Sequence, residues 1–203
     1  MKSKRMLKFV ISSFTVLLLL SGCSSKPSLE LVSSTVDIRN DEERLGGIGV
    51  TSGEKSGEII VPTVLSYDFV LKNTGKQILG RAENPNKQTY EYDDGIKVFI
   101  EPNEKLKAVS KEIMGVNIFS FDEEGRQIAE LGIGKTGVPI IEPNQEGKYT
   151  FDFILGANEE NPELRVVPSS EQLEKLKENA MEASLIVYIE DEEIARFDLS
   201  NSN

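Results

Sequence analysis

The sequence predicts an all-β protein, an antiparallel β-sandwich with one short helix near the C-terminus. Short stretches in which apolar and polar residues alternate recur at spacings of roughly ten residues, as expected of strands that bury one face. Gly and Pro separate these stretches. A convincing helical pattern occurs once, late in the chain, and no longer period repeats. A layered sheet structure without βαβ units follows from these observations.

The first 22 residues have the three parts of a secretory signal peptide. Lys2, Lys4, Arg5 and Lys8 give a basic start, Phe9–Leu20 is an apolar run, and the small residues Ser21 and Gly22 come before Cys23. A spanning helix needs about 20 apolar residues, and the run is shorter than that. We therefore expect the segment to direct export and to be removed.

The residues Leu20-Ser21-Gly22-Cys23 resemble the lipobox of bacterial membrane lipoproteins, including those of Gram-positive bacteria. The resemblance implies cleavage between Gly22 and Cys23 and a diacylglycerol, with chains such as palmitate, on the Cys23 thiol. Two acyl chains give stable anchoring, whereas one is reversible. The resemblance thus implies a signal peptide over 1–22, a lipidated Cys and short tether over 23–28, and a β-sandwich domain over 29–203.

Strand-like segments account for most of the domain. The expected strands and their turns are Leu29–Ile38, a Gly-rich loop over 39–58, Tyr67–Lys72 with a turn over 73–76, Ile96–Ile100 ending before Pro102, Gly115–Phe121 with a turn over 122–125, Gln127–Leu131 returning as a hairpin, Lys148–Leu155, and a final hairpin of Leu185–Ile189 and Ile194–Leu199. In Lys148–Leu155, aromatic residues alternate with polar ones, which indicates a half-buried strand.

A helix is predicted between the last hairpin and the strands before it. Ser169 follows Pro168 and stands three residues before Gln172, which is the spacing of a capping box. The apolar residues that then share one helical face are Leu173, Leu176, Ala180 and Met181. A second helical segment is expected over Glu104–Ile113.

The stretch Tyr67–Gly75, Tyr-Asp-Phe-Val-Leu-Lys-Asn-Thr-Gly, resembles a strand and turn found in immunoglobulin-like domains of bacterial surface lipoproteins. The resemblance implies an immunoglobulin-like sandwich. The chain has no Trp and no pair of Cys residues, so it departs from antibody domains and matches only the looser fold.

Composition excludes several functions. Residues 1–22 hold four of the 23 basic residues and no acidic ones, so residues 23–203 carry a formal charge of −15. Such a charge disfavours nucleic acid as a partner. The chain has no His, and its one Cys is Cys23. Internal disulfides, zinc sites with nitrogen and sulfur ligands, and His-dependent Ser or Cys catalysis are therefore excluded within this chain.

Residues 129–136, Ala-Glu-Leu-Gly-Ile-Gly-Lys-Thr, approach the pattern of a phosphate-binding loop. That loop requires a helix directly after it, and Pro139 and Pro143 prevent one. We expect a Gly-rich β-turn connection there.

Two short motifs resemble the Ser-x-x-Lys and Lys-Thr-Gly elements of penicillin-recognising enzymes: Ser52 with Lys55, and Lys135-Thr136-Gly137. The third element, Ser-Asp-Asn, is missing, and Ser52 lies in an expected loop instead of opening a buried helix.

Three acidic clusters, Asp93-Asp94, Asp122–Glu124 and Glu190–Glu193, offer oxygen atoms that suit Ca²⁺. Their spacing is not that of a dedicated calcium loop, and no cofactor or metal is expected. A carboxylate pair can also serve a glycosidase, but a small chain without Trp is poorly suited to bind sugar rings.

The sequence thus favours a non-enzymatic surface protein, anchored by lipid to the extracytoplasmic face of the cell membrane, that binds an envelope protein or ligand. The alternative is a small envelope hydrolase that uses carboxylates or a Ser/Lys pair. Binding predicts that acidic and aromatic side chains gather into one surface patch, whereas hydrolysis predicts that two carboxylates, or Ser and Lys, converge in a cleft.

Overall fold

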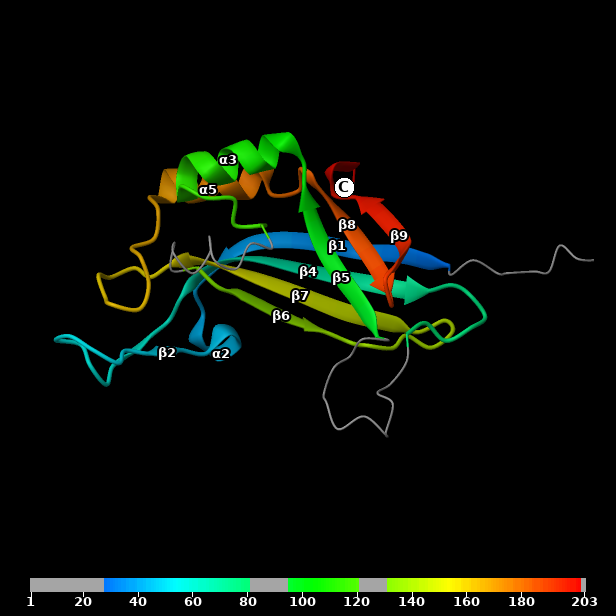
Figure 1. Cartoon of the computed structure of the whole chain (residues 1–203), viewed down its shortest axis with the longest axis horizontal. Helices are drawn as coiled ribbons and strands as arrows, with labels where there is room; N and C mark the ends of the chain where they lie inside the picture. Colours follow the sequence, from blue (N-terminus) through cyan, green and yellow to red (C-terminus); the bar gives the residue numbers. More distant parts are fainter. Residues whose placement is uncertain (1–27, 81–94, 121–130, 202–203) are drawn as a thin grey trace, which may run out of the picture.

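The computed structural model describes residues 28–80, 95–120 and 131–201, and these form two antiparallel sheets that share one core (Figure 1). The four-stranded sheet has the order β1-β4-β7-β6, with β1 at Leu29–Arg39, β4 at Thr63–Asn73, β7 at Glu146–Gly156 and β6 at Ile133–Gly137. The three-stranded sheet has the order β5-β8-β9, with β5 at Ile96–Pro102, β8 at Ala183–Ile189 and β9 at Glu192–Asp198. The predicted all-β class is confirmed.

Alternation along the strands decides which side chains enter the core. On β4, Tyr67, Phe69 and Leu71 are buried, while Asp68 and Val70 between them are partly exposed. The inward residues of β7, Tyr149, Phe151 and Phe153, lie in the same way. From the other sheet, Val98, Ile100, Leu185 and Val187 join them in one cluster. Since these residues come from both sheets, burial between the sheets holds the domain together.

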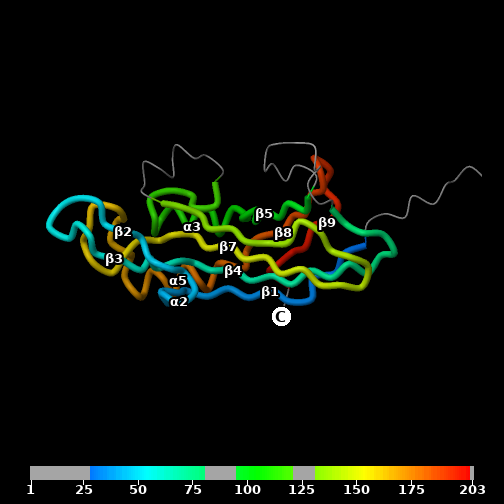
Figure 2. The backbone as a smooth tube through the Cα atoms, turned by 90° about the horizontal axis from the view of Figure 1, so that it is seen from below, coloured from blue at the N-terminus to red at the C-terminus, as the bar shows by residue number. Residues whose placement is uncertain are grey.

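The strands of β5 and β8 run steeply across those of the four-stranded sheet, and the tube view shows the two sheets as layers (Figures 1 and 2). Two helices, α3 at Glu104–Met114 and α5 at Ser170–Asn179, lie side by side at one end. Lys175 of α5 binds Glu112 of α3 at 2.7 Å, and Lys177 binds Asp37 of β1 at 2.8 Å. These ion pairs position α5 against both its neighbours.

Both predicted helices are confirmed, with local caps that the sequence contains. Ser169 and Gln172 form the capping box, in which the Ser169 hydroxyl accepts from the Gln172 N–H. Asn103 caps α3 by accepting from the Leu106 N–H at 3.0 Å. Helix α3 ends at Gly115, whose φ of 77° suits glycine.

The expected loop over 39–58 contains more structure than predicted. A short helix, α2 at Glu42–Leu45, is followed by the small hairpin of β2, Ile48–Gly49, and β3, Ile59–Ile60. Arg44 of α2 donates to Asp68 at 2.7 Å and to Ser66 at 3.1 Å on the outer face of β4. This docking of α2 depends on residues far apart in the chain, and periodicity does not reveal it.

The predicted strand over Gly115–Phe121 is wrong for the described residues 115–120, which form turns. The Ser110 hydroxyl accepts from the Ile118 N–H and donates to the Val116 carbonyl, both at 3.0 Å. These bonds curl the segment under α3, so that its apolar residues enter the core without pairing. The Gly-rich connection expected near Gly134 is instead strand β6, paired with β7.

The predicted turn over 122–125, most of the return strand 127–131, and Gly22 and Cys23 lie outside the described residues. Within the described part of the chain, no helix is long and apolar enough to cross a membrane.

Candidate ligand-binding groove

The outward face of β5 and β8 carries an aromatic pair. Because Ile96, Val98 and Ile100 point into the core, Phe99 points away from it, and the ladder places Phe99 opposite Ile186. Tyr188 lies diagonally from Phe99, with ring centroids 5.6 Å apart and planes at 80°. Diagonal neighbours on one sheet face are close enough for aromatic contact. The two rings therefore form a fixed apolar surface.

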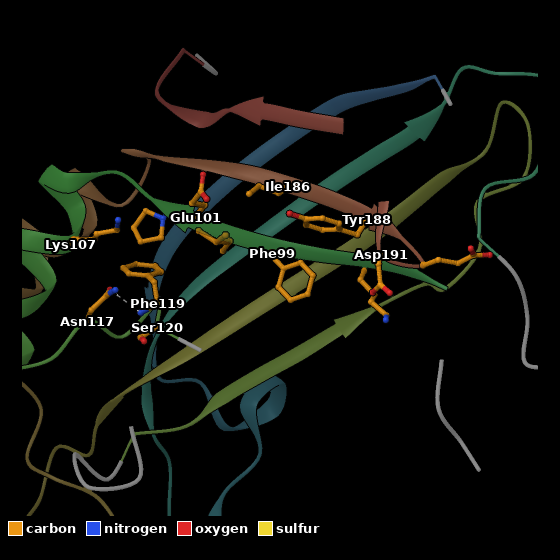
Figure 3. Close-up of a pocket in the computed structure, with 13 residues that line it drawn as sticks. Phe99, Glu101, Lys107, Asn117, Phe119, Ser120, Ile186, Tyr188 and Asp191 are labelled. Atoms are coloured by element: carbon orange, nitrogen blue, oxygen red, sulfur yellow. Dashed lines mark hydrogen bonds between the residues drawn. The ribbon is translucent and has the colours of Figure 1, made fainter. Parts of the chain in front are cut away.

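These rings border an open groove of about 560 Å³, which we call the β5 groove. Figure 3 shows Phe99 and Tyr188 along the strands and Phe119 nearer helix α3. Residues that line the groove are Lys97, Phe99, Ile100, Glu101, Pro102, Lys107, Asn117, Phe119, Ser120, Ile186, Tyr188, Glu190 and Asp191. A concave surface of this size with aromatic walls is typical of binding sites.

The groove is connected to the core through Phe119. This ring is buried at 3% exposure and lies 4.8 Å from the Phe153 ring and 6.3 Å from the Tyr67 ring. The Asn117 side chain accepts from the Phe119 N–H at 3.2 Å, which fixes the turn that presents the ring. The floor of the groove at Phe119 is thus part of the packed interior.

A second groove, of about 610 Å³, lies on the other side of Phe99, between β5 and β6. The Lys135 ammonium lines this second groove, 5.2 Å from the Phe99 ring centroid and 5.6 Å from that of Phe151. Cation–π attraction of this kind holds a Lys side chain over aromatic faces. Beneath Lys135 a cavity of about 10 Å³ reaches Phe119 and Phe153.

Charged residues stand around the aromatic surface. Lys107, in the first turns of helix α3, binds Glu104 of the same helix at 2.8 Å, and this bond lowers the pKa of Glu104. Arg196 of β9 binds Glu193 at 3.0 Å and also Glu101, and these hydrogen bonds raise the pKa of Arg196. The β8–β9 turn, where Glu190 has a φ of 55°, places Glu190 and Asp191 at the groove. Of the three predicted acidic clusters, this is the one within the described residues.

The other candidate site residues lie elsewhere. Ser52 is exposed in the β2–β3 loop, and Lys55 forms an ion pair with Glu159. The stretch Lys135-Thr136-Gly137 belongs to β6. Among the residues that the structure describes, no group of three or more His, Cys, Asp or Glu is arranged to hold a metal ion.

The sequence did not predict Phe99, Phe119 or Tyr188 as site residues. A signal was present for Phe99, since the alternation of Ile96, Val98 and Ile100 assigns an aromatic ring to the outward side of β5. Tyr188 gave no comparable signal, because its partner lies 89 positions away. Phe119 was assigned to a strand that does not form.

Comparison with known proteins adds no relative: no protein family, no curated protein and no solved structure matches the chain.

Proposed function

We propose that this protein is a lipid-anchored, non-enzymatic binding module on the extracytoplasmic face of a bacterial cell membrane, with an immunoglobulin-like domain that holds its ligand in the β5 groove. The observation that carries the binding function is the aromatic pair Phe99–Tyr188 bordering a groove of about 560 Å³ with acidic residues beside it. Aromatic and acidic side chains gathered at one groove support a binding function.

The strand order supports an immunoglobulin-like architecture. Constant-type immunoglobulin sandwiches have sheets ABED and CFG, lettered in chain order. With the two-residue strands β2 and β3 left out, the sheets β1-β4-β7-β6 and β5-β8-β9 have that same order. Helices α3 and α5 then stand between strands C and D and between strands E and F. Paired Cys and Trp are not needed for this arrangement.

The arrangement of charged groups favours binding over hydrolysis. Ser52 and Lys55 occupy an exposed loop, and Lys55 is bound to Glu159. A carboxylic general acid requires a raised pKa. Eight carboxyl groups among the described residues have a shifted pKa, and in each of them the pKa is lowered. Burial acts to raise the pKa of these groups, but hydrogen bonds from neighbouring donors outweigh it. The eight are Asp37, Asp68, Glu104, Glu159, Glu163, Glu182, Glu193 and Asp198.

An extended peptide of an envelope protein is the ligand that suits the groove best. Strand β5 is an edge strand in the described sheet, paired on one side with β8. On its other side the Ile96 N–H donates to the Pro139 carbonyl at 2.9 Å. Antiparallel alternation directs the backbone groups of Val98 and Ile100 to that same side. A peptide that pairs there would lie along the second groove, and its side chains would reach the β5 groove at Phe99, which lines both grooves.

The anchor is tested by labelling cells with a fatty-acid analogue. Wild-type protein should take up the label, and Cys23→Ala should take up none and stay as an uncleaved precursor. Ser25→Ala, two residues away in the tether, is the matched control and should be labelled as wild type. Equal labelling of the Cys23→Ala protein contradicts the lipoprotein assignment.

Ligand binding is tested by placing a photo-crosslinking residue at position 99, in intact cells. We expect a discrete adduct from position 99 that is lost on adding Tyr188→Ala. The same residue at position 59, where Ile59 is 67% exposed, should give no such adduct. Equal adducts from both positions argue against a ligand in the β5 groove.

A further inference from the structure

One end of the domain is fixed close to the proposed lipid. Strand β1 starts at Leu29, and the Ser28 carbonyl accepts from the Thr74 N–H at 2.9 Å, with the two hydroxyls 2.7 Å apart. Five residue steps separate Ser28 from Cys23. An extended chain spans at most about 3.3–3.6 Å per residue, so the Cα of Ser28 lies within about 18 Å of the Cα of Cys23. With the proposed lipid on Cys23, the part of the domain around Ser28 is the part held nearest the bilayer.

Two loops form this part, which we call the proximal end: residues 74–80 after β4, and residues 138–145 before β7. Leu79 and Ile141 exchange two backbone hydrogen bonds of 3.0 Å and join the loops. Asn73, fully buried, donates from its side chain to the Gln77 carbonyl at 2.7 Å and to the Ile141 carbonyl at 2.9 Å. Bonds to both loops from one buried side chain make the proximal end a rigid surface.

The proximal end exposes large apolar side chains. Ile78 is 60% exposed, between the exposed Gln77 and the buried Leu79, and Val138 on the adjoining loop is 37% exposed. Charge on the two loops is balanced, with one Lys, Lys76, and one Glu, Glu142. This balance contrasts with the strongly acidic chain as a whole.

We infer that the proximal end rests on the lipid bilayer, with Ile78 inserted at the headgroup boundary and Lys76 beside it. The inference depends on the proposed lipid anchor at Cys23, because the anchor holds this end next to the membrane. Interfacial binding grows with the apolar area that is buried, and Lys can extend its ammonium toward phosphate while its chain lies on apolar surface. Two acyl chains supply the attachment, and the Ile78 contact fixes the orientation.

The test uses the full lipidated chain in vesicles of phosphatidylcholine and phosphatidylglycerol. An Ile78→Cys variant has one free thiol, since the only natural Cys carries the lipid. A polarity-sensitive fluorophore on that thiol should shift to the blue in vesicles and lose fluorescence when the lipids carry nitroxides. Val138→Cys, on the adjoining loop, should respond in the same direction and serves as the second variant.

Ile59→Cys is the matched control, because Ile59 is equally apolar, 67% exposed, and lies in the hairpin at the opposite end (Figure 1). Its fluorophore should be neither shifted nor quenched. If lipidated protein floats with the vesicles and positions 78, 138 and 59 respond alike, the docking inference is overturned while the anchor stands. If the protein carries no fatty acid and does not float, the anchor itself fails.

Discussion

Tyr67 links strand β4 to the end of helix α5 through its buried hydroxyl. Its ring stacks with Phe69 at 5.9 Å and meets Phe153 edge-on at 6.0 Å. Its hydroxyl donates to the Ala180 carbonyl at 2.8 Å, just after α5. Burial raises the pKa of Tyr67 well above its ordinary value of 10, because a phenolate there would lose its hydration.

Stability should therefore depend on this residue in alkali. The unfolded chain releases the Tyr67 proton near pH 10, whereas the folded chain keeps it, so the contribution is complete below pH 10 and is lost as pH rises above it. For one such group the free energy of unfolding falls by about 1.4 kcal/mol per pH unit. Tyr67→Phe should lose about 1 kcal/mol at neutral pH through the missing hydrogen bond. Above pH 10 its stability should fall less steeply than that of wild type.

Urea titrations at a series of pH values measure both effects. Burial raises the pKa of Tyr149 too, so the slope of the variant should be reduced and not abolished. Parallel curves for wild type and Tyr67→Phe above pH 10 are the result that rejects this account.

Among the helices and strands, α5 is the element whose packing was predicted most completely from the sequence. Leu176 is fully buried, as the helical face predicted, and Leu173 is partly buried against the same core. Lys175 is exposed and binds Glu112. Burial of the side chain thus decreases from Leu176 through Leu173 to Lys175.

Substitutions along α5 should follow that gradation. Truncating a buried Leu costs about 2–5 kcal/mol, so Leu176→Ala should lower Tm by at least about 5 °C. Leu173→Ala should have a smaller effect in the same direction. Lys175→Ala loses one exposed ion pair, worth about 0–1 kcal/mol, and should stay near wild type. Thermal melts of wild type and the three variants measure these differences. Equal Tm values for all four proteins would mean that α5 is not part of the core.

Elements were predictable from the sequence where local pattern and tertiary burial agree. Strand β7 alternates, and α5 has its cap and its apolar face, so both were found. Strand β6, with residues Ile-Gly-Lys-Thr-Gly, has little intrinsic preference for a strand and forms because β7 offers a free edge. Residues 115–120 have the residue pattern of a strand but do not form one, because hydrogen bonds to the Ser110 hydroxyl bend this apolar segment.

The candidate groove could not be assembled from sequence for a related reason. Its walls come from β5, β8 and the turn after α3, which only the pairing of the sheets brings together. The acidic turn Glu190–Glu193 was recognised as a candidate site, but its aromatic neighbours were not. An outward-facing aromatic residue cannot be assigned a function from the sequence before its neighbours in space are known.

As a whole molecule, the domain is held by burial between its sheets and helices. The one Cys is at position 23, and the chain contains no His. We expect thermal melts with and without reductant, and with and without a chelator, to coincide. Calcium added after the chelator serves as the control and should leave Tm unchanged. A large loss of Tm with the chelator would instead indicate a metal that stabilises the fold.

The pairing of β1 with β4 has a mechanical consequence. Ten register pairs join the two strands from Leu29 to Arg39, and antiparallel hydrogen bonds run perpendicular to the strands. Under the proposed lipid anchor and groove ligand, tension between the two would enter the domain at Ser28, along the axis of β1. The bonds are then loaded in shear and must yield together, whereas a pull at the Arg39 end across the sheet would unzip them one at a time. The proposed anchor at this end would therefore load β1 in the direction in which its pairing with β4 is strongest.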